Sequence, residues 1–106
     1  MAWILLFVAG AFEVVWAYYM KQSSGFSRLV PTLITVSTMI VSFLLLSFAM
    51  RSLPLGTAYT VWTGIGAVGT FAVGVAVLGE PANTPRIVAA ALIVGGLVLM
   101  RLSSTQ

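Results

Sequence analysis

Long runs of hydrophobic residues, separated by short polar segments, extend along the whole chain. A helix needs roughly 20 apolar residues to cross the hydrocarbon core of a bilayer, and the first three runs have about that length. The runs predict helices over residues 2–20, 29–50, 57–78 and 86–103. The pattern therefore predicts an all-α integral membrane protein, with one domain of four transmembrane helices over residues 1–106.

The fourth run is the shortest, because only the stretch from Ile87 to Met100 is free of charged residues. Arg86 and Arg101 flank this stretch. Long basic side chains can extend from a buried helix end to the membrane interface. We therefore expect the fourth run to span the membrane too, with the two arginines at opposite interfaces.

Composition narrows the class of protein further. Only 7% of the residues are charged, whereas soluble domains carry about 25%. With no cysteine, no histidine and two acidic residues, the chain has no usual ligand set for a metal ion. Its basic residues are scattered singly and form no patch of the kind that binds nucleic acid. Because no nucleophile is paired with a base, we expect neither an enzyme nor a cofactor.

The glycine spacing of segment 64–69 matches that of a dinucleotide-binding loop. The segment lies inside an apolar run, however, with no preceding strand and no acidic residue about 20 positions later. We interpret its glycines as positions in a membrane helix.

Glu13 is the one acidic residue inside the four apolar runs. A carboxylate at bilayer depth costs roughly 2.5–3.5 kcal/mol by insertion scales, so such a residue usually marks a functional site. On a helix, Gly10, Trp16 and Ala17 share a face with Glu13, and the Trp16 indole can donate a hydrogen bond toward the carboxylate. The alternative is a surface charge on a soluble amphipathic helix, but no polar stripe accompanies Glu13.

Residues with polar groups in the second and third apolar runs are further candidates for a functional site. Tyr59, Trp62, Thr63 and Gly66 share one helical face. The two aromatic residues could bind a carboxylate and enclose a cation, or they could belong to an interfacial aromatic belt. Ser42 lies in the middle of the second run, where it is either a packing residue bonded to its own helix or part of the same site.

The distribution of lysine and arginine gives almost no orientation signal. Arg51 and Arg101 lie on one side of the predicted membrane, whereas Lys21, Arg28 and Arg86 lie on the other. Because the excess of these residues sets orientation, a balance of this kind predicts insertion both ways up. Such a population could form an antiparallel homodimer.

A second copy is expected on separate grounds. Four helices with short connections can hardly enclose a hydrated pathway, and Glu13 has no basic partner within its own spans. A second subunit would supply a second Glu13 and a shared cavity. Ala91 and Gly95 form a small-xxx-small pair on the fourth helix, which is a weak signal for helix packing.

Three segments of the sequence carry a family pattern: Gly10-x-x-Glu13-Val14-x-Trp16-Ala17, Lys21-x-Ser23-x-Gly25-Phe26, and Pro54-x-Gly56-Thr57-Ala58-Tyr59-x-x-Trp62-Thr63-Gly64-Ile65-Gly66. Together they resemble the small multidrug resistance family, and more closely its guanidinium-exporter branch. The similarity covers nearly the whole chain.

The resemblance implies an antiparallel, dual-topology homodimer in the bacterial inner membrane. It implies export of guanidinium and small guanidinyl cations in exchange for protons, by alternating access. A broader exporter of quaternary ammonium or lipophilic cations on the same fold is the alternative, and a sister chain could replace the second copy. A membrane subunit without transport activity gives no reason for Glu13.

The resemblance also assigns roles to individual residues. The family's essential glutamate, which binds both proton and substrate, falls on Glu13. Its site tyrosine and tryptophan fall on Tyr59 and Trp62. The tryptophan and the helix-two serine of the guanidinium branch fall on Trp16 and Ser42. The quaternary-ammonium branch usually has a small residue in place of Trp16, which favours guanidinium as the substrate.

Two further residues are expected at this site. Gly10 lies one helical turn before Glu13 and is expected to line the same cavity. Thr60 stands where the family usually has alanine, so we expect it to border the site and to influence the substrate range rather than the mechanism.

Overall fold

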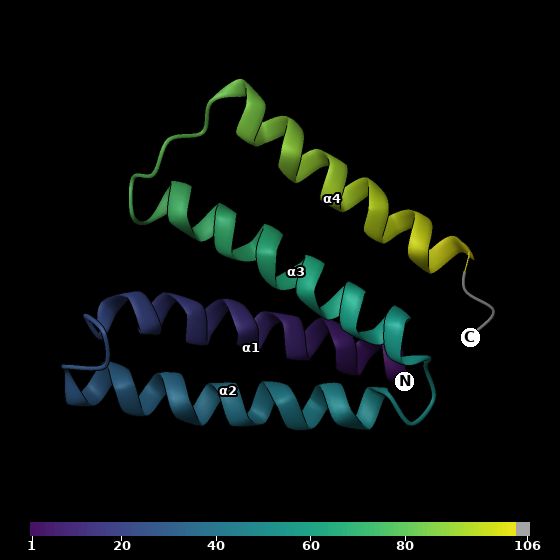
Figure 1. Ribbon diagram of the computed structural model, residues 1–106, viewed down its shortest axis with the longest axis horizontal. Coiled ribbons are helices and arrows are strands. Elements are labelled where there is room, and N and C mark those ends of the chain that lie inside the picture. The colour runs from purple at the N-terminus through teal and green to yellow at the C-terminus, as the bar shows by residue number, and fades with distance from the viewer. Residues whose placement is uncertain (104–106) are drawn as a thin grey trace.

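The computed structural model describes residues 1–103 and contains four helices: α1 (Ala2–Gln22), α2 (Leu29–Ala49), α3 (Leu55–Ala76) and α4 (Thr84–Ser103) (Figure 1). All four are long and apolar enough to cross a membrane. The prediction of an all-α chain with four spans is therefore confirmed for this part of the sequence. The third helix begins at Leu55, directly after Pro54. A proline disfavours the helical conformation of the residue before it, so α3 does not extend further toward the N-terminus.

The helices run alternately up and down, so the start of α1, the end of α4 and the α2–α3 connection lie at one end of the bundle (Figure 1). The central helix is α1, which packs against α2 on one side and α3 on the other. The last helix, α4, packs its backbone only against α3, and it diverges from the rest in Figure 1. The bundle is thus a compact three-helix unit with a loosely attached fourth helix.

Two turns reverse the direction of the chain, one between α1 and α2 and one between α3 and α4. Between α1 and α2, Ser23 is fully buried; its hydroxyl donates to the Met20 carbonyl at 2.7 Å and accepts from the Phe26 N–H at 3.0 Å. Between α3 and α4, Gly79 has φ +70°, a conformation that glycine adopts without strain. The Glu80 N–H then donates to the Gly74 carbonyl at 3.0 Å, which ends α3.

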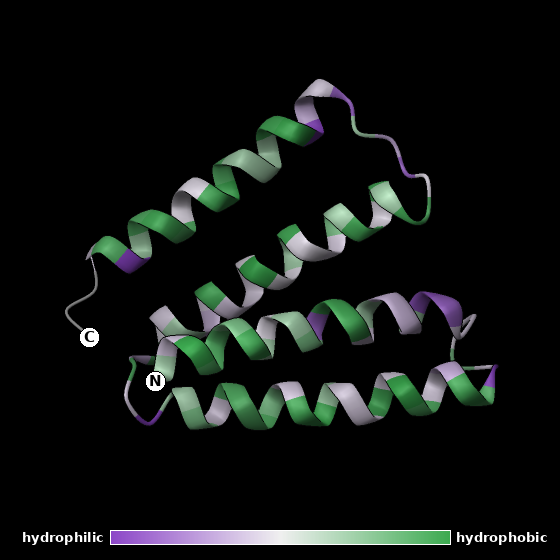
Figure 2. Cartoon of the chain, turned by 180° about the vertical axis from the view of Figure 1, so that it is seen from behind, coloured by the Kyte–Doolittle hydropathy of each residue, from purple (hydrophilic) through white to green (hydrophobic). Residues whose placement is uncertain are grey.

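The buried apolar cluster lies among the first three helices and consists of Leu6, Ala9, Leu46, Ala49, Leu53, Ala58, Val61 and Trp62. None of the residues of α4 is buried. Figure 2 shows hydrophobic residues all round the helices, with polar residues concentrated at helix ends and loops. That distribution suits a helix bundle surrounded by lipid, because the outer surface has no need of polar groups.

Candidate functional site

Glu13 projects from the middle of α1 toward α3, where its carboxyl group lies against Gly66. A Cβ atom at position 66 would overlap that carboxyl group, so only glycine leaves room for it. The Oε1 atom of Glu13 is buried and has no hydrogen-bond partner among the described residues. The protein thus keeps a carboxyl oxygen at membrane depth unused by its own donors.

Ser42 joins the three packed helices at nearly the same depth. Its hydroxyl donates to the Ala9 carbonyl of α1 at 2.7 Å and accepts a hydrogen bond from Trp62 Nε1 of α3 at 3.0 Å. Ser42 is fully buried and Trp62 nearly so. Both hydrogen bonds run between helices, so Ser42 is not bonded back to its own helix.

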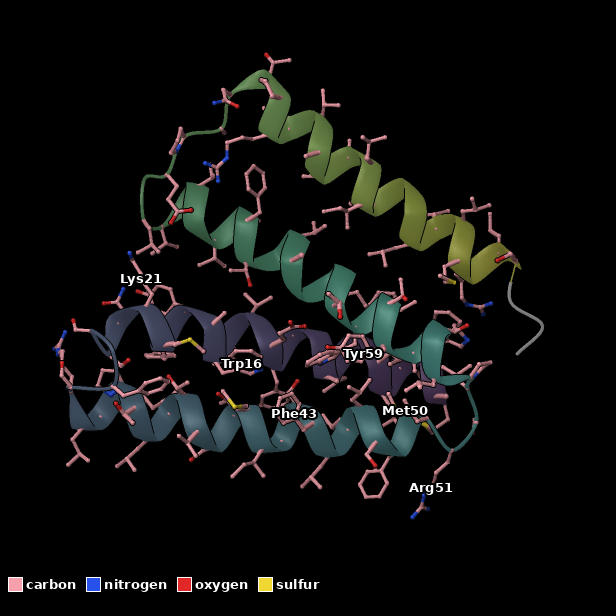
Figure 3. The ribbon with its side chains drawn as sticks, in the orientation of Figure 1. Trp16, Lys21, Phe43, Met50, Arg51 and Tyr59 are labelled. Carbon is pink, nitrogen blue, oxygen red and sulfur yellow. The ribbon has the colours of Figure 1, made fainter. Side chains whose placement is uncertain are left out.

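Four aromatic rings form a row beside this hydrogen-bonded group. Tyr59 meets Trp62 edge-on with ring centroids 5.6 Å apart, and Trp62 meets Phe43 at the same separation. Phe43 in turn contacts Trp16 at 6.4 Å, again edge-on. In Figure 3, Trp16 and Phe43 lie between α1 and α2, and Tyr59 comes from α3. The row draws on all three packed helices.

Phe43 was not predicted as a site residue. Phe43 lies in the apolar sequence of α2, where no alternation of polar and apolar residues shows which face of the helix is buried. Its position in the sequence therefore does not indicate a role in the site. Only the packing of α2 against α1 places its ring between Trp16 and Trp62. Adjacent residues of a helix are about 100° apart around its axis, so the prediction for Ser42 could not be extended to Phe43.

The predicted hydrogen bond from Trp16 to Glu13 is not formed. Trp16 Nε1 is buried without a partner among residues 1–103, as is Glu13 Oε1. The physical reason lies in packing: the Trp16 ring meets Phe43 of α2, which holds the indole on the α2 side of α1. Sharing a helical face therefore did not suffice to pair the two groups.

Gly10 and Thr60 lie in different surroundings: Gly10 in the contact between α1 and α3, and Thr60 on an open groove. Gly10 is buried under Ile65 in the α1–α3 contact, where a Cβ atom would overlap that side chain. Thr60 is exposed and lines a groove of about 390 Å³ together with Tyr59, Thr63 and Ile93 of α4. Tyr59 itself is 52% exposed, so this flank of the site is open in a single subunit.

Comparison with known proteins places this arrangement in a class. Residues 1–93 match the family described as Small Multidrug Resistance protein. The chain belongs to that family, and its four candidate spans make it a multi-pass membrane protein.

Individual relatives agree over almost the full length. The guanidinium exporter of Escherichia coli (strain K12) is 57% identical over 104 residues, which is 98% of this chain and 99% of that protein. The guanidinium exporter of Proteus vulgaris is 55% identical over 98% of this chain and 100% of its own length. The guanidinium exporter of Citrobacter freundii is 53% identical, with 98% and 99% covered.

Proposed function

We propose that the protein exports guanidinium and small guanidinyl cations across the bacterial inner membrane in exchange for protons. The observation that carries the proposal is the Glu13 carboxyl group, which lies at membrane depth against Gly66 and whose Oε1 atom has no hydrogen-bond partner among the described residues. The names of the relatives support guanidinium as the cation.

The chemistry of the site matches such a cation. Guanidinium is planar and permanently charged, and its paired N–H groups can bind both oxygens of a carboxylate. Tyr59 and Trp62 carry ring faces of the kind that attract a desolvated cation, and Tyr59 is half exposed beside the open groove. The Ser42–Trp62 hydrogen bond holds one of these rings in place.

Exchange follows from the cost of an uncompensated carboxylate in the membrane. That cost is roughly 2.5–3.5 kcal/mol by insertion scales, and either a proton or the cation can remove it. If the two compete for the same carboxyl group, a site that is empty and ionised reorients slowly. Protons then enter as cations leave, by alternating access between the two sides.

The complete transporter in this proposal is an antiparallel homodimer. The open flank at Tyr59 and Thr60 leaves the site incomplete within one subunit, and a second copy would contribute its own Glu13. Two carboxyl groups in a common cavity would take up protons as a coupled pair. The even distribution of basic residues fits insertion in both orientations.

Reconstituted vesicles provide the test. Guanidinium and tetramethylammonium uptake are measured under an imposed pH gradient, with the wild type and Glu13→Gln in parallel. We expect uptake of guanidinium well above that of tetramethylammonium, driven by the gradient and absent in Glu13→Gln. Equal uptake of both cations would favour a broader exporter, and gradient-independent uptake would contradict proton exchange.

A further inference from the structure

An apolar slot lies between α1, α3 and α4, separate from the carboxyl group of Glu13. It encloses about 280 Å³. Trp3 and Phe7 of α1 form one wall and Val61 and Ile65 of α3 another, while α4 contributes a row of residues that ends near Arg101. Apart from Arg101, every side chain that lines the slot is hydrophobic.

The mouth of the slot is positively charged. The Arg101 guanidinium carbon lies 4.8 Å from the centre of the Trp3 ring, so the indole face supports the charge. The Nε1 atom of Trp3 is buried and has no acceptor among residues 1–103. This end of the slot therefore carries the positive charge of Arg101.

The two acidic side chains of the protein are too far away to neutralise Arg101. Glu13 lies ten residues along α1 from Trp3, which is about 15 Å at the rise of a helix. Glu80 follows α3 and lies at the opposite end of the bundle (Figure 1). Among the described residues, no acidic side chain neutralises Arg101, so an anionic group of another molecule can bind there.

We propose that the slot binds a phospholipid with an anionic head group, with its phosphate on Arg101 and one acyl chain against the apolar walls. The slot extends along α4 from Arg101 to Val94, about 10 Å at 1.5 Å per residue. One leaflet has a hydrocarbon depth of about 15 Å, half of the bilayer core, so the upper part of an acyl chain fits. Basic pockets between membrane helices are typical binding sites for anionic head groups.

The charge at the mouth argues against the other possible occupants. A transported cation would be repelled by Arg101 and would find no carboxylate there. A second copy of the chain carries a net charge of +3 and only two acidic side chains, so it offers few groups that could neutralise the arginine. An anionic lipid supplies both the charge and the apolar chain.

Occupation of the slot has a structural consequence for α4. Among the described helices, the backbone of α4 packs closely only against α3. Toward α1, Arg101 of α4 makes a cation–π contact with Trp3. An acyl chain between α1 and α4 would fill the space that separates them. Bound lipid is therefore expected to raise the thermal stability of the protein.

Native mass spectrometry of the purified protein tests the site, with phosphatidylglycerol and phosphatidylcholine of equal chain length as probes. We expect Arg101→Gln to reduce retained phosphatidylglycerol about fivefold, the factor that corresponds to roughly 1 kcal/mol per basic residue near anionic lipid. Arg101→Lys should retain most of the binding. Val98→Phe, which fills the slot without a change of charge, should reduce retention of both lipids.

Arg51→Gln is the matched control. Arg51 also lies over an aromatic ring, 5.1 Å from the centre of Phe48, but it points away from the bundle and is not among the residues that line this slot (Figure 3). We expect this variant to retain lipid as the wild type does, and each variant is checked for its oligomeric state. An equal loss in Arg51→Gln and Arg101→Gln would overturn the proposal, as would equal retention of the two lipids by the wild type.

A cysteine at position 98 tests the remaining occupant. The chain has no natural cysteine, so any disulfide must form between introduced residues. Efficient disulfide dimerisation of Val98→Cys in membranes would show that a second copy covers the slot, and it would contradict the lipid site. Labelling of this cysteine by a lipid-soluble maleimide, and its protection by added phosphatidylglycerol, is the expected result.

Discussion

The indole N–H of Trp62 donates a hydrogen bond to the Ser42 hydroxyl, which in turn donates to the backbone carbonyl of Ala9. One serine thereby satisfies a donor from α3 and an acceptor from α1 while fully buried on α2. Because a hydroxyl can donate and accept at once, this single small side chain links three helices, which an alanine at the same position could not do.

Removal of the Ser42 hydroxyl should weaken both stability and binding. Ser42→Ala leaves the Trp62 N–H and the Ala9 carbonyl without these partners, and hydrogen bonds between membrane helices contribute about 0.6 kcal/mol each, up to about 1.7. We expect a loss of about 1–2 kcal/mol in unfolding free energy, together with weaker guanidinium binding. Unfolding in mixed detergents measures the change in unfolding free energy. Ser47→Ala, at an exposed position of the same helix, serves as the control.

Substitution of Gly66 should abolish transport through a purely steric effect. In Gly66→Ala the new methyl group would overlap the Glu13 carboxyl group, which must then move away from α3. We expect gradient-driven guanidinium uptake to fall to background. Gly56→Ala lies on the same helix in open space and should transport normally. Normal uptake by Gly66→Ala would show that the carboxyl group does not need its present position.

Guanidinium binding should depend on pH in one direction only. Protonation neutralises the carboxylate that the cation requires, so affinity is highest at alkaline pH and falls as the pH is lowered. Calorimetric titration of the wild type at a series of pH values measures this dependence. Binding that stays constant across the series would contradict competition between proton and substrate.

The balanced basic residues predict both orientations in the membrane. A single cysteine in place of Ser24, in the α1–α2 turn, should react with an impermeant maleimide from both sides of the membrane. Two lysines added to the same turn should bias insertion and reduce activity, because only one orientation of subunit would remain. Labelling from a single side in the unmodified background would disprove dual topology.

Thr60 should influence which cations are carried without a change in proton dependence. Its side chain lines the groove with Tyr59 and Thr63, and Glu13 is not among the residues that line this groove. We expect Thr60→Ala to alter the ratio of guanidinium to bulkier substituted guanidinium ions transported. The pH profile, measured in the same preparation, should stay unchanged, and a shifted profile would place Thr60 in a different role.

Sequence patterns predicted the four spans well, because the apolar runs reflect the thickness of the bilayer directly. Contacts between helices were less predictable. The spacing of Trp16 and Glu13 indicated a shared face, yet the Trp16 ring turned to Phe43 instead. Periodicity along one helix says which residues lie together on it, but the neighbour that they meet depends on how all the helices pack.

The choice of acceptor by Ser42 shows the same limit. A serine in the middle of an apolar run can bond to its own helix or to another, and the sequence allows both. In the structure the α1–α2 packing brings the Ala9 carbonyl within 2.7 Å, which decides between them. Phe43 had no signal at all, because a phenylalanine in a membrane helix most often faces lipid.

The contact between α1 and α3 is an interlocking one: Ile65 occupies the space at Gly10, Val14 that at Gly69, and the Glu13 carboxyl group that at Gly66. Because side chains of one helix fill the space at glycines of the other, such contacts resist both sliding of the two helices and rotation of one helix about its own axis. The direction of the carboxyl group is therefore tied to α3. In the proposed exchange, Glu13 would therefore become exposed to each side of the membrane in turn by tilting of α1 and α3 as one body, and not by rotation of α1 in place.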